Sequence, residues 1–237
     1  MSATSQISSR SPFDENPVRL ESSRMRATLP PWVGGTSWAG RRSGARFWMC
    51  AAFCGALAIA VTVSAVAGTG EQGAGIALHL TGRFSFLLFW PAYAGGAMAT
   101  LFAPHFGKFA GHGRDFGLAY ASAQLVHFGL VARLICISGR PVMESIMPFF
   151  AIGIVWTYVL ALSSLERLSD IFSPKHWRVL RAVGLEYLAL VFFADLVLLP
   201  VRSRTRHPLE YLPFSILKVV GSLLRLAASV PNQKFVY

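Results

Sequence analysis

Ionisable side chains inside long apolar runs are the residues of this sequence that could carry chemistry. His127 lies near the middle of one such run, with Gln124 and Tyr120 before it on the same face of a helix. An imidazole at this depth in a membrane has three roles open to it. It can coordinate an iron, relay a proton, or hydrogen-bond to a neighbouring helix.

Three further charges lie in apolar runs. Arg133 follows His127 in the same run, and Glu186 and Asp195 lie in a later one. A charge in the middle of a bilayer costs about 2.5–3.5 kcal/mol on insertion scales, so such charges tend to pair. Because both runs are expected to cross in the same direction, Arg133 and Asp195 reach a similar depth, and we predict a structural ion pair between them. The alternatives are that Arg133 extends outward to the head groups, and that the three charges line a transport pathway.

No side chains in the sequence suggest a catalytic centre. It holds no nucleophile–base pair and no cluster of metal ligands, so no catalytic residue is predicted. No glycine fingerprint of the G-x-G-x-x-G type follows a strand, and no flavin domain is appended. A nicotinamide site is therefore not expected.

The elements that position these residues are membrane helices. Of the 237 residues 54% are apolar and only 14% are charged, with a mean hydropathy of +0.49, whereas about a quarter of residues are charged in soluble domains. Runs long enough to span a bilayer cover residues 47–67, 84–103, 116–137, 145–165 and 183–200, with a weaker sixth at 209–230. We therefore predict an all-α membrane protein, a polytopic helical bundle of five to six transmembrane helices over 47–230. No room remains for a soluble enzyme domain.

The segments that flank the bundle are polar. Residues 1–46 are rich in Ser, Pro and Arg and are expected to be disordered, and 231–237 form a short tail. The first apolar run is too long for a secretory signal, so we expect it to be retained as a helix. Most Lys and Arg of the short loops fall inside if the N-terminus is cytoplasmic, which predicts a multi-pass protein of the cell membrane in that orientation.

The net charge of +11 bears on what the chain binds. The basic residues lie mostly at helix ends as membrane anchors. The expected partner is therefore the lipid bilayer, and binding to nucleic acid is not expected.

In the sixth run a polar stripe of Ser215, Lys218, Ser222 and Arg225 recurs at helical spacing. Such a helix either crosses the bilayer or lies on its surface.

Four short motifs follow one another in the stretch 81–200. They are Thr81-Gly82-Arg83, Gly117 with Leu125-Val126-His127, Leu160-Ala161-Leu162-Ser163-Ser164, and Pro174-Lys175-His176-Trp177-Arg178-Val179-Leu180-Arg181. Together they resemble the ferric reductase-like transmembrane domain family. Their order looks most like the bacterial haem-binding membrane subunit of the methionine-sulfoxide reductase system. The resemblance implies a bacterial inner membrane and a b-type haem held between the third and fifth helices.

The resemblance also implies which residues would ligate the haem. His127 matches the family's third-helix ligand, so it is the predicted haem and iron ligand. On the fifth helix the family places histidines where this chain has Arg181 and, further on, Ala194 and Asp195, so these ligand positions are degenerate.

Three functions follow as hypotheses. The first is haem-b electron transfer, in which the chain is at most the membrane subunit of an oxidoreductase and a protein partner supplies or accepts electrons. The second is a haem-free assembly or regulatory subunit of the same fold. The third is a small transporter.

Overall fold

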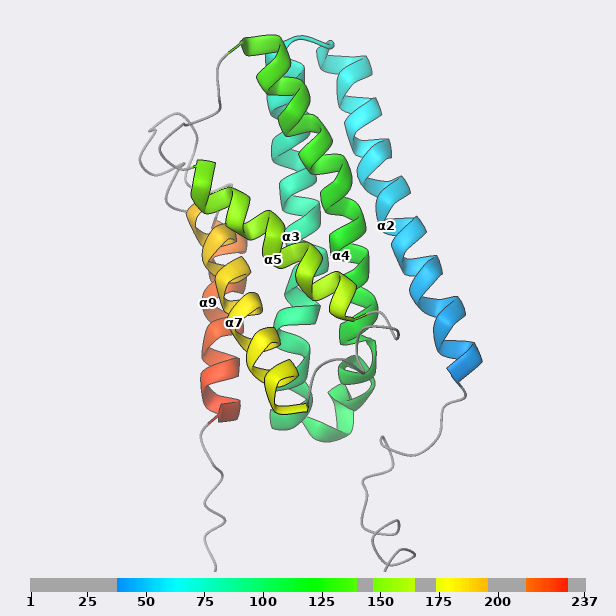
Figure 1. Ribbon diagram of the computed structural model, residues 1–237, viewed down its shortest axis with the longest axis vertical. Helices are drawn as coiled ribbons and strands as arrows, with labels where there is room; N and C mark the ends of the chain where they lie inside the picture. Colours follow the sequence, from blue (N-terminus) through cyan, green and yellow to red (C-terminus); the bar gives the residue numbers. More distant parts are fainter. Residues whose placement is uncertain (1–37, 140–146, 165–173, 196–211, 230–237) are drawn as a thin grey trace, which may run out of the picture. The chain divides into compact units, whose positions relative to one another are not determined.

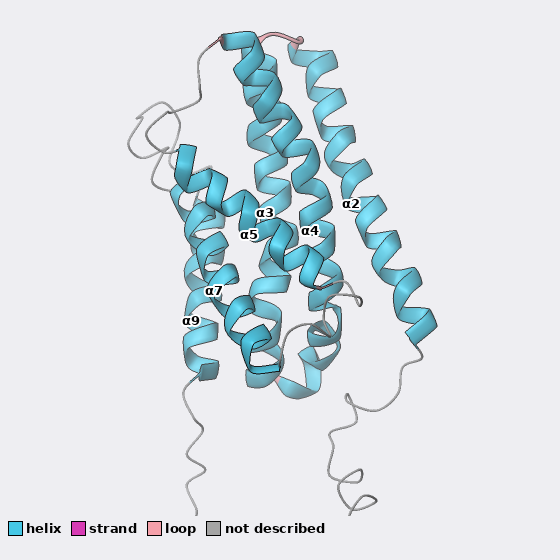
Figure 2. Ribbon diagram, viewed as in Figure 1, coloured by secondary structure: helices cyan, strands magenta, loops and turns pink. Residues whose placement is uncertain are grey.

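The computed structural model describes residues 38–139, 147–164, 174–195 and 212–229 (Figure 1). Six helices and no strand form in these ranges, as Figure 2 shows. The helices are α2 (Trp38–Ala67), α3 (Glu71–Leu101), α4 (Ala103–Ser138), α5 (Met147–Ser163), α7 (Pro174–Phe193) and α9 (Leu212–Ser229). The predicted all-α helical bundle is confirmed.

Helix lengths and compositions are compatible with a multi-pass membrane protein. Among the described residues, the stretches 44–67, 71–101, 111–138 and 212–229 are long and apolar enough to cross a bilayer, and α5 is a shorter apolar helix of 17 residues. Large apolar side chains on these helices point outward, such as Val66, which is 84% exposed. In water such surfaces would be unfavourable, whereas hydrocarbon accepts them.

Four of the described helices, α2, α3, α4 and α7, begin earlier than the apolar runs predicted. Helix α2 starts at Trp38, within the segment expected to be disordered, and residues 1–37 lie outside the described part. Helix α3 starts at Glu71, well before residue 84, and the polar Thr81 in its added part is buried in the bundle. The predicted tail and the end of the fifth run also lie outside the described residues.

Helix α3 is the centre of the bundle. It contacts α2, α4, α7 and α9, while α5 packs mainly on α7 (Figure 1). An aromatic cluster of Phe86, Phe89, Tyr93, Tyr120 and Phe192 joins α3, α4 and α7, with Phe89 and Phe192 ring centroids 5.2 Å apart. Of the core clusters in the described residues, this one has the most buried members.

Close helix contacts depend on glycine. A Cβ atom added to Gly184 of α7 would lie 2.7 Å from Trp156 Cε3 and 2.9 Å from Leu160 Cδ1 of α5. A side chain at this position would have to displace Trp156 or Leu160, so glycine lets α5 and α7 approach closely, as small residues commonly do in membrane bundles.

The polar stripe of α9 faces the bundle. Its Ser222 and Arg225 contact α3 and α7, and Trp90 Nε1 of α3 donates a hydrogen bond of 2.7 Å to Leu217 O. On the opposite face Leu223 and Leu226 are 59% and 65% exposed. A helix lying on a membrane surface would turn its polar side to water, so this arrangement favours a helix that crosses.

Candidate functional site

His127 of α4 is held against α3 by a hydrogen bond. Its Nδ1 lies 3.1 Å from Thr81 Oγ1, and that hydroxyl lies 2.9 Å from Ala77 O and 3.1 Å from Leu78 O. Because the hydroxyl has a single proton and donates it to one of these carbonyls, Nδ1 donates to Thr81. In the neutral ring Nε2 then carries the lone pair.

His127 and Asp195 converge on Gly82. A Cβ atom built at Gly82 would lie 3.3 Å from His127 Cε1 and 3.9 Å from Asp195 Oδ2. Asp195 lies just beyond the end of α7, so α3, α4 and α7 each contribute one residue to this point. The absence of a side chain at Gly82 provides the space that the imidazole and the carboxylate share.

The structure does not bring Arg133 and Asp195 together. Arg133 Nη2 donates a hydrogen bond of 2.9 Å to Thr69 O in the connection between α2 and α3. Asp195 lies beside Gly82, at the level of His127, and Arg133 lies six residues, or about 9 Å, further along α4. The depths that helical rise predicts from the sequence put Arg133 and Asp195 closer together than they are in the structure.

Glu186 is part of a polar cluster that links three helices. Glu186 Oε1 accepts from Arg225 Nε at 2.8 Å, and its Oε2 accepts from the Tyr93 hydroxyl at 2.9 Å. The same hydroxyl lies 3.1 Å from Ser222 Oγ, and the Arg225 guanidinium lies 4.6 Å from the centroid of the Tyr93 ring. The stripe on the sixth run pointed to Arg225, but the sequence did not pair it with Glu186.

A cavity of about 260 Å³ lies between α3, α4, α5 and α7, and sequence reasoning missed it. Phe89, Leu185 and Leu188 supply apolar wall, and Tyr120 and Thr157 supply two hydroxyls 3.1 Å apart. The remaining lining residues are Ala92, Gly113, Arg114, Gly117, Leu160, Ala161, Ser163, Ser164, Trp177 and Arg181. The lining residues come from different helices and follow no regular spacing in the sequence. Only those that belong to the short motifs of the stretch 81–200, such as Gly117 and Arg181, could be singled out from the sequence.

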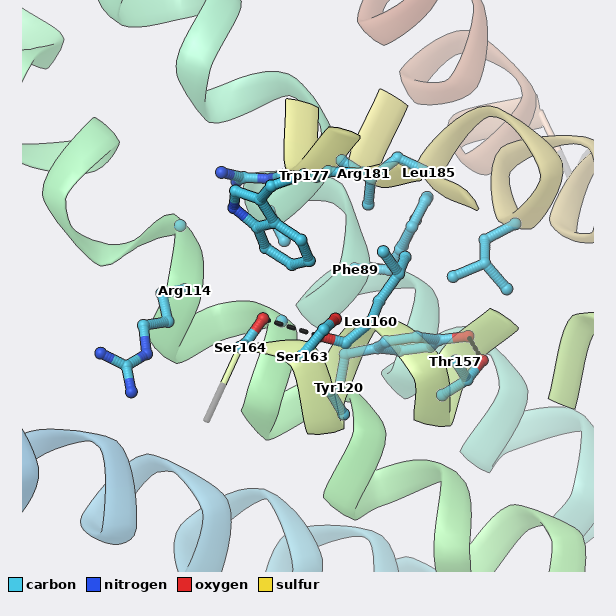
Figure 3. Close-up of a pocket in the computed structure, with 15 residues that line it drawn as sticks. Phe89, Arg114, Tyr120, Thr157, Leu160, Ser163, Ser164, Trp177, Arg181 and Leu185 are labelled. Carbon is cyan, nitrogen blue, oxygen red and sulfur yellow. Dashed lines mark hydrogen bonds between the residues drawn. The ribbon is translucent and has the colours of Figure 1, made fainter. Parts of the chain in front are cut away.

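Figure 3 shows how the cavity is built. Trp177 and Arg181 come from α7 on one side, and Tyr120, Ser163 and Ser164 lie across from them. Each of the two serine hydroxyls donates to a backbone carbonyl one turn back in α5, which leaves its oxygen lone pairs available.

The residues described do not fit a haem iron held between histidines of α4 and α7. His127 is not among the residues that line the cavity between α4 and α7. The histidine of α7, His176, lies in its first turn, at the opposite end from Asp195. Arg181 occupies the position where the resemblance expects a ligand, and a guanidinium has no lone pair to give a metal. Within the described ranges no three of the His, Cys, Asp and Glu side chains are grouped to hold a metal ion.

Comparisons of the chain with models of protein families, with curated proteins and with solved structures gave no match.

Proposed function

We propose that this chain is a haem-free membrane subunit of the ferric reductase-like fold, with assembly or regulatory work in place of electron transfer. It resides in the cell membrane with a cytoplasmic N-terminus. One observation carries the proposal: the space between α4 and α7 is lined by Arg181 and contains no histidine among its lining residues.

Charge supports the same conclusion. An arginine at a ligand position adds a permanent positive charge and cannot bind iron. Its presence beside Trp177 and the serines of α5 is suited to holding a polar partner or ligand by hydrogen bonds. Such a protein acts by binding, and the partner that it would assist is a second membrane or membrane-bound protein.

The absorption spectrum of the purified full-length chain tests the proposal. The protein should show no Soret band after expression with added haem precursor, and haem added in detergent should not bind stoichiometrically. A Soret band that shifts on reduction with dithionite, and that is lost in His127→Ala, would instead establish the haem-b electron carrier.

A small transporter is the second candidate, because His127 and Asp195 share the space at Gly82 inside the bundle. Two titratable groups at one point in the membrane interior are typical of proton pathways. Proton flux through the reconstituted protein, abolished by Asp195→Asn, would favour this function. Flux equal to that of protein-free vesicles would reject it.

A further inference from the structure

Arg181 carries a positive charge that the described residues leave unbalanced. The neighbouring carboxylate of α7, Glu186, is already paired with Arg225. Arg181 itself forms no ion pair with any carboxylate in the part of the chain that the structure describes. A guanidinium that lines a cavity and has no carboxylate partner among the described residues favours an anionic ligand.

The Arg181 guanidinium lies in the cavity wall where α7 faces α4. Arg181 Nη2 lies 3.7 Å from a Cβ atom built at Gly113, so the side chain extends from α7 to the facing helix. The next residue, Arg114, also lines the cavity, and its Nε is buried without a hydrogen-bond partner among the described residues. The Arg114 side chain points away from Trp177, so it is a second cation at the rim (Figure 3).

Part of the cavity wall is apolar. Phe89 and Leu188 are 1% and 2% exposed, and Leu185 lies beside them. The Thr157 hydroxyl donates to Gly153 O at 2.9 Å, so the Tyr120 hydroxyl donates to Thr157 and neither proton is left for a ligand. The interior therefore suits a hydrocarbon chain, and the Arg181 end suits a charged head group.

We propose that the cavity between α3, α4, α5 and α7 binds a single-chain amphiphile with an oxyanion head group. The phosphate or carboxylate oxygens accept hydrogen bonds from Arg181, and the chain lies against Phe89 and Leu188. The volume of about 260 Å³ is near the lower limit of about 300 Å³ for ligand pockets, so a head group and a short length of chain fill it. The site does not depend on whether the protein is haem-free, since His127 takes no part in it.

Thermal unfolding of the full-length protein in a neutral detergent tests the site. The probes are decyl phosphate, decanoate, inorganic phosphate and zwitterionic decylphosphocholine, each titrated at fixed detergent concentration. Decyl phosphate, decanoate or both should raise the unfolding temperature in a saturable way, because ligand binding stabilises the folded state. Which of the two does so identifies the head group. Inorganic phosphate and decylphosphocholine should have little effect.

Three variants assign the response to this cavity. Arg181→Gln should raise the apparent Kd of the responding amphiphile roughly tenfold or more, as expected when a charge-assisted hydrogen bond is lost. Arg178→Gln is the matched control, because Arg178 lies on the same helix but does not line the cavity, and it should bind as the wild type does. Ala161→Phe fills the cavity without changing the charge and should also abolish the response.

The outcomes that overturn the proposal are specific. They are an equal response to inorganic phosphate or decylphosphocholine, no response to either anionic amphiphile, or equal losses in Arg178→Gln and Arg181→Gln. If Arg181→Gln does not fold, Ala161→Phe decides: retained binding in that variant overturns the site, and lost binding supports it. A Soret band in the same preparation would contradict the haem-free function and leave these binding results unaffected.

Discussion

Arg225 of α9 and Glu186 of α7 form an ion pair with an Nε–Oε1 distance of 2.8 Å, and Tyr93 of α3 hydrogen-bonds to the other carboxylate oxygen. The last helix of the described chain is therefore attached to the bundle through charge as well as through packing. Because Arg225 is paired with Glu186 on the bundle side of α9, the opposite, apolar face of this helix can contact lipid.

The ion pair between Glu186 and Arg225 should be measurable by a double-mutant cycle. Glu186→Gln and Arg225→Gln should each destabilise the fold, and the coupling between them should be about 1 kcal/mol, as for polar contacts in other membrane bundles. The measurement is the free energy of unfolding in mixed micelles with increasing dodecyl sulfate. Glu71→Gln, at the exposed start of α3, is the control and should have little effect. A coupling of zero would mean that the ion pair does not stabilise the protein.

Arg133 and Asp195 should behave independently. Each has its own surroundings, Thr69 O for Arg133 and the Gly82 region for Asp195. The losses caused by Arg133→Leu and Asp195→Leu should therefore add to within about 0.5 kcal/mol in the double variant. The same unfolding assay measures this. A double variant much more stable than additivity predicts would restore the ion pair expected from the sequence.

Gly82 should tolerate a side chain poorly. Because a Cβ atom there is already 3.3 Å from His127 Cε1, Gly82→Val should crowd the imidazole and the Asp195 carboxylate and destabilise by about 1–3 kcal/mol. Gly75→Val, in the same helix with nothing within 4 Å of its added Cβ atom, is the matched control. Equal unfolding free energies for the two variants would show that the space at Gly82 is not needed.

Topology can be read from reporter fusions. Reporters after Arg114 or Lys175 should be cytoplasmic, and reporters after Gly73 or Arg140 should be outside. Successive helices alternate in direction, so the start of α2 and the end of α9 lie at the same end of the bundle (Figure 1). A reporter after Tyr237 should therefore also be cytoplasmic. An outside signal at that position would mean that α9 does not cross, and an outside signal after Arg114 would reverse the orientation.

The fold was predictable from the sequence because hydrocarbon leaves the backbone few choices. A long apolar run must be helical to satisfy its own peptide groups, so composition alone predicts the bundle. The start of α3 was not predictable in this way. Residues from Glu71 to Arg83 include polar side chains that would be unfavourable in lipid, but the structure buries Thr81 and half-buries His79 and Arg83.

The site was predictable only in part. His127 stood out as a histidine in an apolar run, and its position in α4 is as expected. Its partner Thr81, the ion pair of Glu186, and the cavity around Arg181 each join helices that are far apart in the chain. Hydropathy and helical spacing describe one helix at a time, so they cannot specify which faces of different helices meet.

The inward polar stripe of α9 has a consequence for biogenesis. Lys218 and Arg225 make this helix costly to insert by itself, at about 2.5–3.5 kcal/mol per charge at the bilayer centre. Glu186 precedes Arg225 in the chain, so its carboxylate leaves the ribosome before its cationic partner does. A chain truncated before residue 212 leaves Glu186 without its cation and Tyr93 and Trp90 of α3 without the helix that covers them. Those polar groups of α3 and α7 would then face lipid, so a chain that lacks α9 should be less stable in the membrane than one that contains it.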